Sequence, residues 1–132
     1  MADMQDEGVR ALFEARNHAV VSTHNGDGSI HSAVVWVDLV DGRPAVNSAV
    51  GRAWPTHLER DPSITLLVYD EKNPFEYVEV RGTAEGTTDG ADAHIDRLAE
   101  KYLDQDRYPY HQEGEQRITY VVTPSRVRHQ VQ

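Results

Sequence analysis

Residues 47–62, NSAVGRAWPTHLERDP, contain the strongest fold signal in the chain. The stretch is typical of a strand end, a tight turn at Gly51-Arg52 and a short helix that opens at Trp54-Pro55, because proline is tolerated in the first turn of a helix. Such a turn directs backbone N–H groups and one arginine towards the same point, which is a way to hold a phosphate without a P-loop. The stretch therefore predicts a site for an anionic ligand. The next segment, residues 70–82, combines turn residues with a strand-like sequence and fits a β-rich domain that holds a planar, anionic cofactor.

The flanking residues predict a small domain made mainly of β-structure. Asn25-Gly26-Asp27-Gly28 and Asp41-Gly42 are hairpin signals, and strands are expected at 18–24, 30–38, 44–49, 64–69, 75–87 and 117–123. Residues 30–38 have apolar side chains on both faces, so we expect this strand to be central in a barrel wall. Apolar spacing predicts helices over 6–15 and 89–103, and Pro55 in the first turn with a stop at Asp61-Pro62 predicts a short helix over 54–60. Hairpin-linked strands pair antiparallel, which favours a small barrel with helices set against its ends.

Composition restricts the class of protein further. The 132 residues are enough for one domain with one core, and 39% hydrophobic and 27% charged residues are typical of a globular protein. The formal net charge of −9 at pH 7 repels nucleic acid and anionic membranes, so we expect neither as a partner. Any anionic ligand must then depend on local arginines. The chain has no cysteine, no long apolar run and an acidic N-terminus, which predicts a cytoplasmic protein without disulfides.

Four residues around the turn are the first candidates for ligand contacts. Arg52 follows a glycine at the mouth of the short helix, and a guanidinium suits bidentate phosphate binding, although a solvated arginine fits the same sequence. Trp54 either covers the edge of a bound ring or closes the end of the barrel. Asn47 and Ser48 end a strand beside the turn, where they either bond a ligand or stabilise the turn itself.

No residue pattern identifies a metal site or a catalytic group. The seven histidines are too scattered for a compact ligand pattern, and the chain has no Gly-x-Ser-x-Gly nucleophile motif. Trp36 and Tyr77 lie on predicted strands, where a place in the core is the default expectation. We therefore predict no metal site and name no catalytic residue.

Three motifs resemble the pyridoxamine-phosphate-oxidase-like split β-barrel family, and more narrowly its deazaflavin branch, which uses coenzyme F420. GRAWPTHLERDP at residues 51–62 resembles the family's GR…NLRRDPR segment, and NPFEYVEVRG at 73–82 resembles the branch's NPYRYVEVRG. HIDRLAEKY at 94–102, followed by DRYP at 106–109, resembles HIDxLAxKY…DRYP. The resemblance covers nearly the whole chain. It implies one split-barrel domain over residues 1–132, α+β but mainly β, of about six antiparallel strands with two to three helices.

The resemblance also implies a homodimer with two cofactor sites at the interface. In that arrangement the turn at residues 51–52 binds phosphate, the strand end before it approaches the ring or the ribityl chain, and residues 31–36 form a platform beneath the ring. The loop near residues 73–74 contacts cofactor, from either subunit. The implied cofactor-binding residues are Asn47, Ser48, Gly51, Arg52, Ala53, Trp54, Pro55, His57, Asn73, Pro74 and Tyr108, and the implied substrate pocket contains His31, Trp36 and Tyr77.

One departure from the family pattern bears on the cofactor. Many members have a lysine two residues after the turn arginine, where this chain has Trp54. The missing charge either weakens phosphate binding or shifts it to helix N–H groups, and flavin mononucleotide (FMN) stays an alternative to F420. The expected activity is F420-dependent hydride transfer to or from a small conjugated or electron-poor substrate, such as a conjugated carbonyl, a quinone or a tetrapyrrole. The alternatives are an FMN-dependent oxidase or reductase, a non-catalytic F420 carrier and a structural dimer without a ligand.

Overall fold

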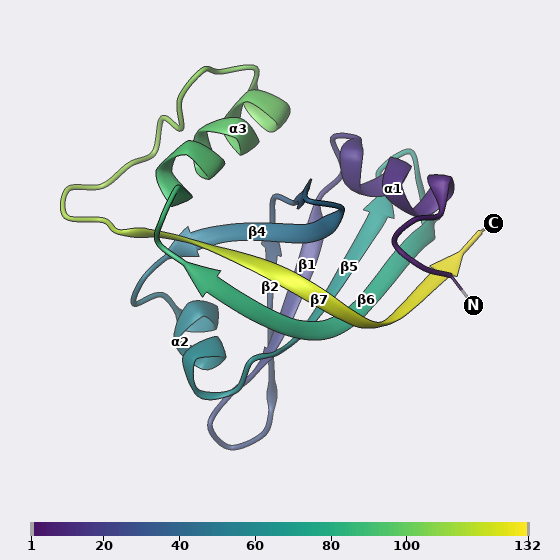
Figure 1. Ribbon diagram of the computed structural model, residues 1–132, viewed down its shortest axis with the longest axis horizontal. Helices are drawn as coiled ribbons and strands as arrows, with labels where there is room; N and C mark the ends of the chain where they lie inside the picture. The colour runs from purple at the N-terminus through teal and green to yellow at the C-terminus, as the bar shows by residue number, and fades with distance from the viewer. Residues whose placement is uncertain (1, 132) are drawn as a thin grey trace.

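Seven antiparallel strands form one curved sheet in the computed structural model, which describes residues 2–131 (Figure 1). The strand order is β2-β1-β5-β6-β7-β4-β3. With three helices, the chain has the predicted α+β, mainly β architecture, with one strand more than expected. The strands are β1 (Ala19–His24), β2 (Ile30–Val35), β3 (Asp38–Val40), β4 (Arg43–Ala49), β5 (Ser63–Asp70), β6 (Asn73–Thr87) and β7 (Arg117–Gln130).

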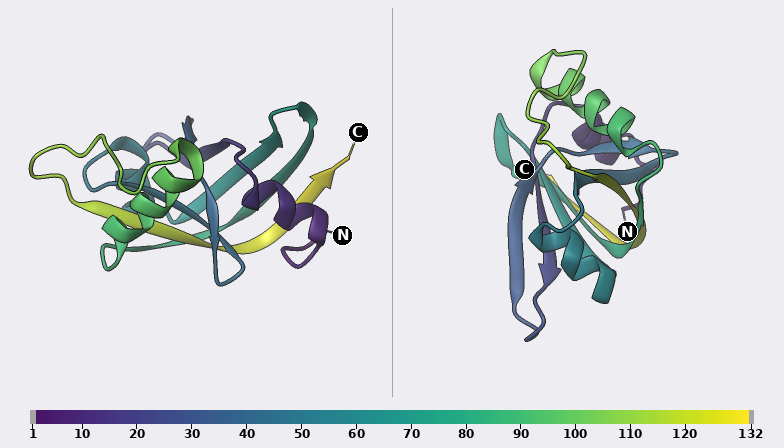
Figure 2. Two further views of the ribbon diagram at one scale, coloured as in Figure 1. Left: turned by 90° about the horizontal axis from the view of Figure 1, so that it is seen from above. Right: turned by 90° about the vertical axis from the view of Figure 1, so that its left-hand side faces the viewer.

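The three helices lie at different places around this sheet (Figure 2). Helix α1 (Glu7–Glu14) buries Val9, Leu12 and Phe13, whose i, i+3, i+4 spacing puts one apolar stripe against β3, β5 and β6. Helix α2 (Ala53–Arg60) packs on β1, and helix α3 (Ala91–Leu103) packs on β4 and β7. The first turn of α2 and one side of α3 therefore lie near the same end of β4.

Strands β6 and β7 are the longest elements and pair along most of their length, so they link the two halves of the sheet (Figure 1). Their register shifts between Arg81 and Gly82. At Gly82 a Cβ atom would lie 2.2 Å from the backbone oxygen of Thr123, so only glycine fits this close approach of the two strands. The bend lets one pair of strands serve both halves of the barrel.

The apolar residues divide into a main core and a smaller second cluster. The main core fills the barrel interior with residues from α1, α2 and the strands, and it includes the fully buried Phe13, Leu66 and Val80. The second cluster joins α3 to the segment after β2 and consists of Ile95, Leu98 and Tyr102, with the partly buried Trp36, Leu103 and Tyr108 packed on it. This second cluster forms one side of the site described below.

Two local predictions were wrong. The sequence predicted a strand over 30–38 in the centre of the barrel wall. In the structure, β2 ends at Val35 and is an edge strand that pairs only with β1. The chain leaves the sheet because side chains of α3 satisfy Val37: its N–H donates to the Tyr102 hydroxyl at 3.1 Å, and its carbonyl accepts from Lys101 Nζ at 2.5 Å. The loop expected near residues 73–74 lies at Glu71 and Lys72 instead, because Asn73 and Pro74 already belong to β6.

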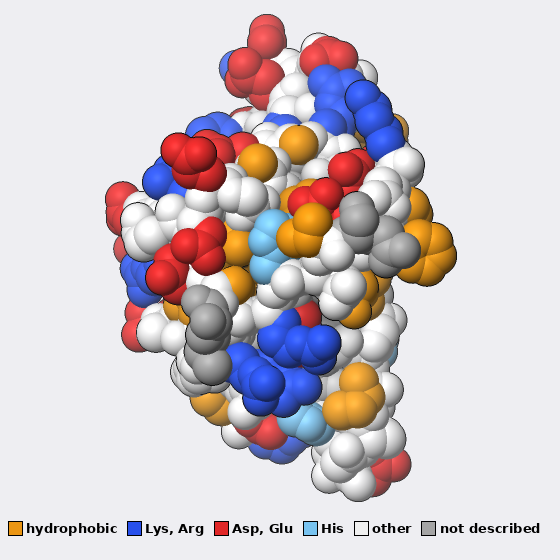
Figure 3. Space-filling model, turned by 90° about the vertical axis from the view of Figure 1, so that its right-hand side faces the viewer, with side chains coloured by type: hydrophobic (Ala, Val, Ile, Leu, Met, Phe, Trp, Pro, Cys, Tyr) orange, Lys and Arg blue, Asp and Glu red, His pale blue; other side chains and the backbone are white. Residues whose placement is uncertain are grey.

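Charge is unevenly distributed over the surface despite the net charge of −9. Figure 3 shows lysine and arginine side chains gathered in separate groups among acidic ones on the face that carries the chain ends. Electrostatic attraction of an anionic ligand must therefore be judged from the charges at each site. Within residues 2–131, none of the helices combines the length and the apolar character that a membrane span requires.

Candidate functional site

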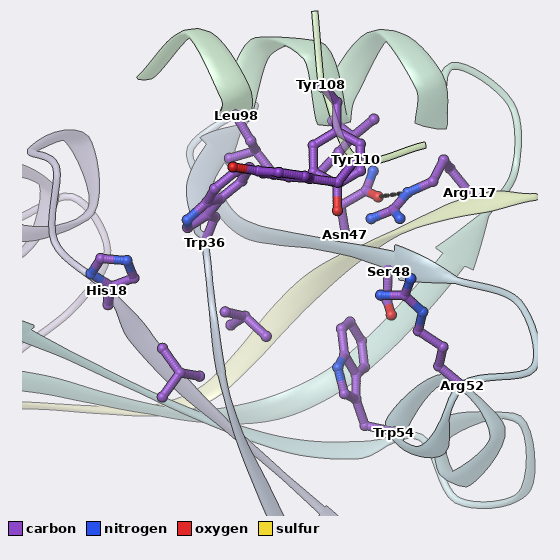
Figure 4. A pocket seen from close by; sticks show the side chains of 13 residues that line it. His18, Trp36, Asn47, Ser48, Arg52, Trp54, Leu98, Tyr108, Tyr110 and Arg117 are labelled. Carbon is purple, nitrogen blue, oxygen red and sulfur yellow. Dashed lines mark hydrogen bonds between the residues drawn. The ribbon is translucent and has the colours of Figure 1, made fainter. Parts of the chain in front are cut away.

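A cavity of about 340 Å³ lies where β4, α3, the start of α2 and the loop of residues 104–116 meet (Figure 4). Its lining combines aromatic rings, aliphatic side chains and two guanidinium groups. This mixture is typical of small-molecule sites, which are mostly apolar with a few polar groups that orient the ligand. The lining residues are His18, Val34, Val35, Trp36, Asn47, Ser48, Arg52, Trp54, Ile95, Leu98, Tyr108, Tyr110 and Arg117.

Aromatic rings form one wall of the cavity. Trp36 stacks on Tyr102 with ring centroids 5.2 Å apart and planes at 6°, and Tyr108 meets Trp36 edge to face at 6.0 Å. The rings of Tyr110 and Tyr108 also meet edge to face, with centroids 5.6 Å apart, and the Tyr110 side chain is exposed. Figure 4 shows Trp36, Tyr108 and Tyr110 on the same side of the cavity. Flat rings in this arrangement suit a planar, conjugated ligand.

The aromatic wall is anchored by Lys101 and Tyr102 on α3. Lys101 Nζ donates to the backbone oxygens of Phe13 and Val37 at 2.6 and 2.5 Å, and burial lowers its pKa to about 8. The Tyr102 hydroxyl donates to the backbone oxygen of Asn17 at 2.5 Å, and burial raises its pKa to about 12. These bonds tie α3 to α1 and to the segment after β2, and thereby hold Trp36 in place.

Two arginines form the opposite, cationic end of the cavity. Arg117 at the start of β7 is buried, and its Nε donates to the Asn47 Oδ1 at 2.9 Å while its guanidinium lies over the Tyr108 ring at 5.0 Å. Arg52 precedes α2, and about half of its side chain is exposed. Both bind the carboxylate of Glu115, at 3.1 Å from Arg52 Nη2 and 3.0 Å from Arg117 Nη1.

A buried polar network fixes the position of Arg117. Asn47 Nδ2 lies 3.0 Å from the Ala91 carbonyl, which accepts its hydrogen bond, and 3.1 Å from His94 Nδ1. His94 is 2% exposed, and its Nε2 lies 2.8 Å from Asp38 Oδ1. Because the protein itself occupies both ends of the Asn47 amide, Asn47 orients Arg117 here rather than offering free donors to a ligand.

The structure brings six of the residues predicted from the sequence to this cavity: Trp36, Asn47, Ser48, Arg52, Trp54 and Tyr108. Trp54 is 6% exposed and packs against Tyr120, so it belongs to the core while its edge faces the cavity. Gly51, Ala53 and Pro55 lie in the adjoining turn and helix start. Nothing lies within 4 Å of the place that a Gly51 Cβ would take, so a ligand could reach this backbone.

The remaining predicted residues lie elsewhere. His57 and His31 contact each other with ring centroids 5.3 Å apart, and His57 also bonds Thr23, between α2 and the β1–β2 hairpin. The pKa of His57 is lowered by partial burial and by the nearby charges of His31 and Arg60. Asn73, Pro74 and Tyr77 lie at the start of β6, and none of them lines the cavity.

Sequence reasoning missed Arg117, Tyr110, His18 and the carboxylate of Glu115. Arg117 begins a predicted strand, and nothing in its immediate sequence distinguishes it from a solvated arginine. The aromatic residues of the loop, Tyr108 and Tyr110, were the available signal, because two rings in a polar, irregular stretch need a surface on which to pack. Within residues 2–131, no three histidine or acidic side chains are placed to hold a metal ion.

The sequence profile of pyridoxamine 5′-phosphate oxidase matches residues 5–131, nearly the whole chain. The chain belongs to the pyridoxamine 5′-phosphate oxidase family. This confirms the family that the motifs resembled. Among curated proteins, none matches the sequence significantly.

Solved structures with the family fold differ in what they are described to do. A structure described as an F420 reductase has a TM-score of 0.81 and 24% identity, and the match covers 93% of this chain and 98% of that one. A putative pyridoxamine 5′-phosphate oxidase from Listeria innocua has a TM-score of 0.71 at 15% identity over 96% and 98% of the two chains. A heme-binding protein from Mycobacterium smegmatis has 0.67 at 18% identity over 98% and 54%. At such identities the likeness shows the fold, and the ligand must be argued from the cavity.

Proposed function

We propose that this protein is an F420-dependent oxidoreductase, which binds the deazaflavin ring in the cavity and transfers hydride between reduced F420 and a small conjugated or electron-poor substrate. The observation that supports this most is the combination, in one cavity, of an aromatic wall at Trp36 and Tyr108 with a cationic end at Arg52 and Arg117. A planar ring that carries an anionic chain matches both features. The three sequence motifs favour F420 over FMN, and the fold is compatible with this choice, since a structure described as an F420 reductase shares it.

The residues at the site fit such a cofactor without rearrangement of the fold. The ring would lie beside Trp36 and Tyr108, and its anionic group would lie at Arg52 and the N-terminal turn of α2, where N–H groups have no partner within the helix. The open space beside Gly51 leaves room for a phosphate against the backbone. Trp54 and Leu98 add apolar surface to the sides of the cavity.

F420, when bound, supplies the hydride chemistry, and the protein contributes binding, orientation and charge. Arg117 holds a positive charge at a defined place, since Asn47, Glu115 and the Tyr108 ring all contact it. Glu115 offsets this charge, so the Arg117 N–H donors would stabilise negative charge on a substrate carbonyl or quinone oxygen as hydrogen-bond donors held in place. Asn47 acts through Arg117 and is therefore a positioning residue.

A homodimer is the second part of this proposal. Ile30 and Val34 on the outer side of β2 are 59% and 67% exposed, although β2 is an edge strand, and Val34 also lines the cavity. Apolar residues on an open edge strand favour association with another chain. A second copy seated over β2 would cover these side chains and close the cavity on its open side. The cofactor would then lie at the interface.

Parallel titrations of the purified protein with F420 and with FMN test the cofactor. We expect F420 to bind more tightly, and Arg52→Ala to weaken its binding about tenfold, since the variant loses a charge-assisted contact. Arg97→Ala is the matched control, because Arg97 is exposed on α3 and outside the cavity. Preference for FMN would assign the protein to the FMN alternative, and tight F420 binding without turnover on any acceptor would make it a carrier. If neither cofactor binds, the redox function is refuted.

A further inference from the structure

The carboxylate of Glu115 lies between the two guanidinium groups of the cavity. Its Oε2 accepts from Arg52 and its Oε1 accepts from Arg117, and only 5% of the Glu115 side chain is exposed. His111 Nδ1 lies 3.6 Å from Oε1. Each carboxylate oxygen is thus taken up by a different arginine, which is how a bound carboxylate or phosphate is held by an arginine pair.

This arrangement changes the charge that a ligand meets. Arg52 and Arg117 bring two positive charges to the cavity, and Glu115 cancels one of them. The cancellation is strongest for Arg117, whose side chain is only 3% exposed and which therefore gains little from water. An incoming anion competes with the Glu115 carboxylate for the same N–H donors.

There is space beside Glu115 for its carboxylate after displacement. It lies at the end of the loop of residues 104–116, and a second hollow of about 400 Å³ adjoins the first. Arg52 lines both hollows, while Glu115 lines only the second. The second hollow is also lined by Gln112 and Gln116, whose amide groups suit a displaced carboxylate.

We infer that Glu115 is an internal competitor for the arginine pair: its carboxylate occupies the place of a ligand's anionic group, and an anion binds to the pair by displacing it. Glu115 thereby determines specificity. Weakly binding monoanions, which gain little from the arginines, are excluded, and groups of higher charge density, such as phosphate esters and diphosphates, are selected. This deepens the proposed function, since it concerns the same cavity, but it can be tested without any cofactor.

The test compares Glu115→Gln with Glu113→Gln in the absence of cofactor. Both variants remove one negative charge from the same loop, but Glu113 is exposed and has no ion pair within residues 2–131, so it controls for net charge. Inorganic pyrophosphate is the probe, and the intrinsic fluorescence reports on it because both tryptophans of the chain, Trp36 and Trp54, line the cavity. We expect Glu115→Gln to bind pyrophosphate about tenfold more tightly than the wild type, and Glu113→Gln to bind it as the wild type does.

Glu115→Ala with added formate gives a second test that does not depend on a stable variant. If the arginine pair accepts an external carboxylate, formate will raise the melting temperature of Glu115→Ala, or restore its folding, while sodium chloride at the same ionic strength will not. The wild type should respond to neither salt. Equal pyrophosphate affinity in folded Glu115→Gln, or no specific effect of formate, would overturn the competition and leave a purely structural ion pair. Failure of F420 binding would leave the competition standing, so the two proposals fail separately.

Discussion

Lys101 provides a direct test of how α3 is held beside the cavity. Its ammonium group is partly buried and donates to the backbone oxygens of Phe13 and Val37, and burial lowers its pKa from 10.5 to about 8. Between these two pH values the unfolded chain binds a proton that the folded chain has released. The free energy of unfolding must therefore rise with pH over this range, as the cost of burying the charged form disappears.

The size of this effect follows from the lowered pKa. A fall from 10.5 to about 8 corresponds to roughly 3 kcal/mol, at about 1.4 kcal/mol for each pH unit. Lys101 keeps part of its surface in water, so we expect about 2 kcal/mol of stabilisation to appear on going from about pH 7.5 to about pH 10. Tyr102 changes the free energy of unfolding in the opposite direction, because its raised pKa of about 12 makes the folded state lose stability above about pH 10.

Urea unfolding of the wild type and of Lys101→Met at several pH values measures this contribution. The methionine variant does not titrate at residue 101 but keeps Tyr102, so the contribution of Tyr102 cancels in the difference between the two proteins. We expect the wild type to gain about 2 kcal/mol relative to Lys101→Met between about pH 7.5 and pH 10. A difference that stays constant with pH would refute the burial of a charged Lys101 against these carbonyls.

Three further predictions concern the sheet, the interface and the aromatic wall. Gly82→Ala should destabilise the protein by about 3 kcal/mol or more, because its Cβ would lie 2.2 Å from the Thr123 carbonyl oxygen. Gly26→Ala is the control and should have little effect, and thermal unfolding compares the two variants. Val34→Glu should convert the proposed dimer to a monomer in sedimentation analysis, and an unchanged mass would count against β2 as the interface. Trp36→Ala should weaken the binding of a planar cofactor about tenfold without changing the selectivity of the site for pyrophosphate over sulfate, as measured by calorimetry.

The local patterns were enough for the fold class but not for the place of every strand. The hairpin signals and the apolar spacing within residues 89–103 depend on neighbouring residues, and they predicted elements that the structure contains, the helix beginning two residues later than expected. The strand at 30–38 was predicted wrongly, because its end at Val35 depends on Tyr102 and Lys101, more than 60 residues later in the chain. No local pattern contains that information.

The same distinction applies to the cavity. The residues alone were enough to predict a mainly β domain of this family and to place Arg52 at a turn before a short helix, because turns and helix starts depend on adjacent residues. The three-dimensional packing was needed to show that Glu115 lies between Arg52 and Arg117. It was also needed to show that His57 faces His31, away from the cavity. Those placements depend on the pairing of β7 with β4 and on the path of the loop before β7, which bring together charges that are 63 residues apart. Long-range pairing of this kind is set by the packing of the whole sheet.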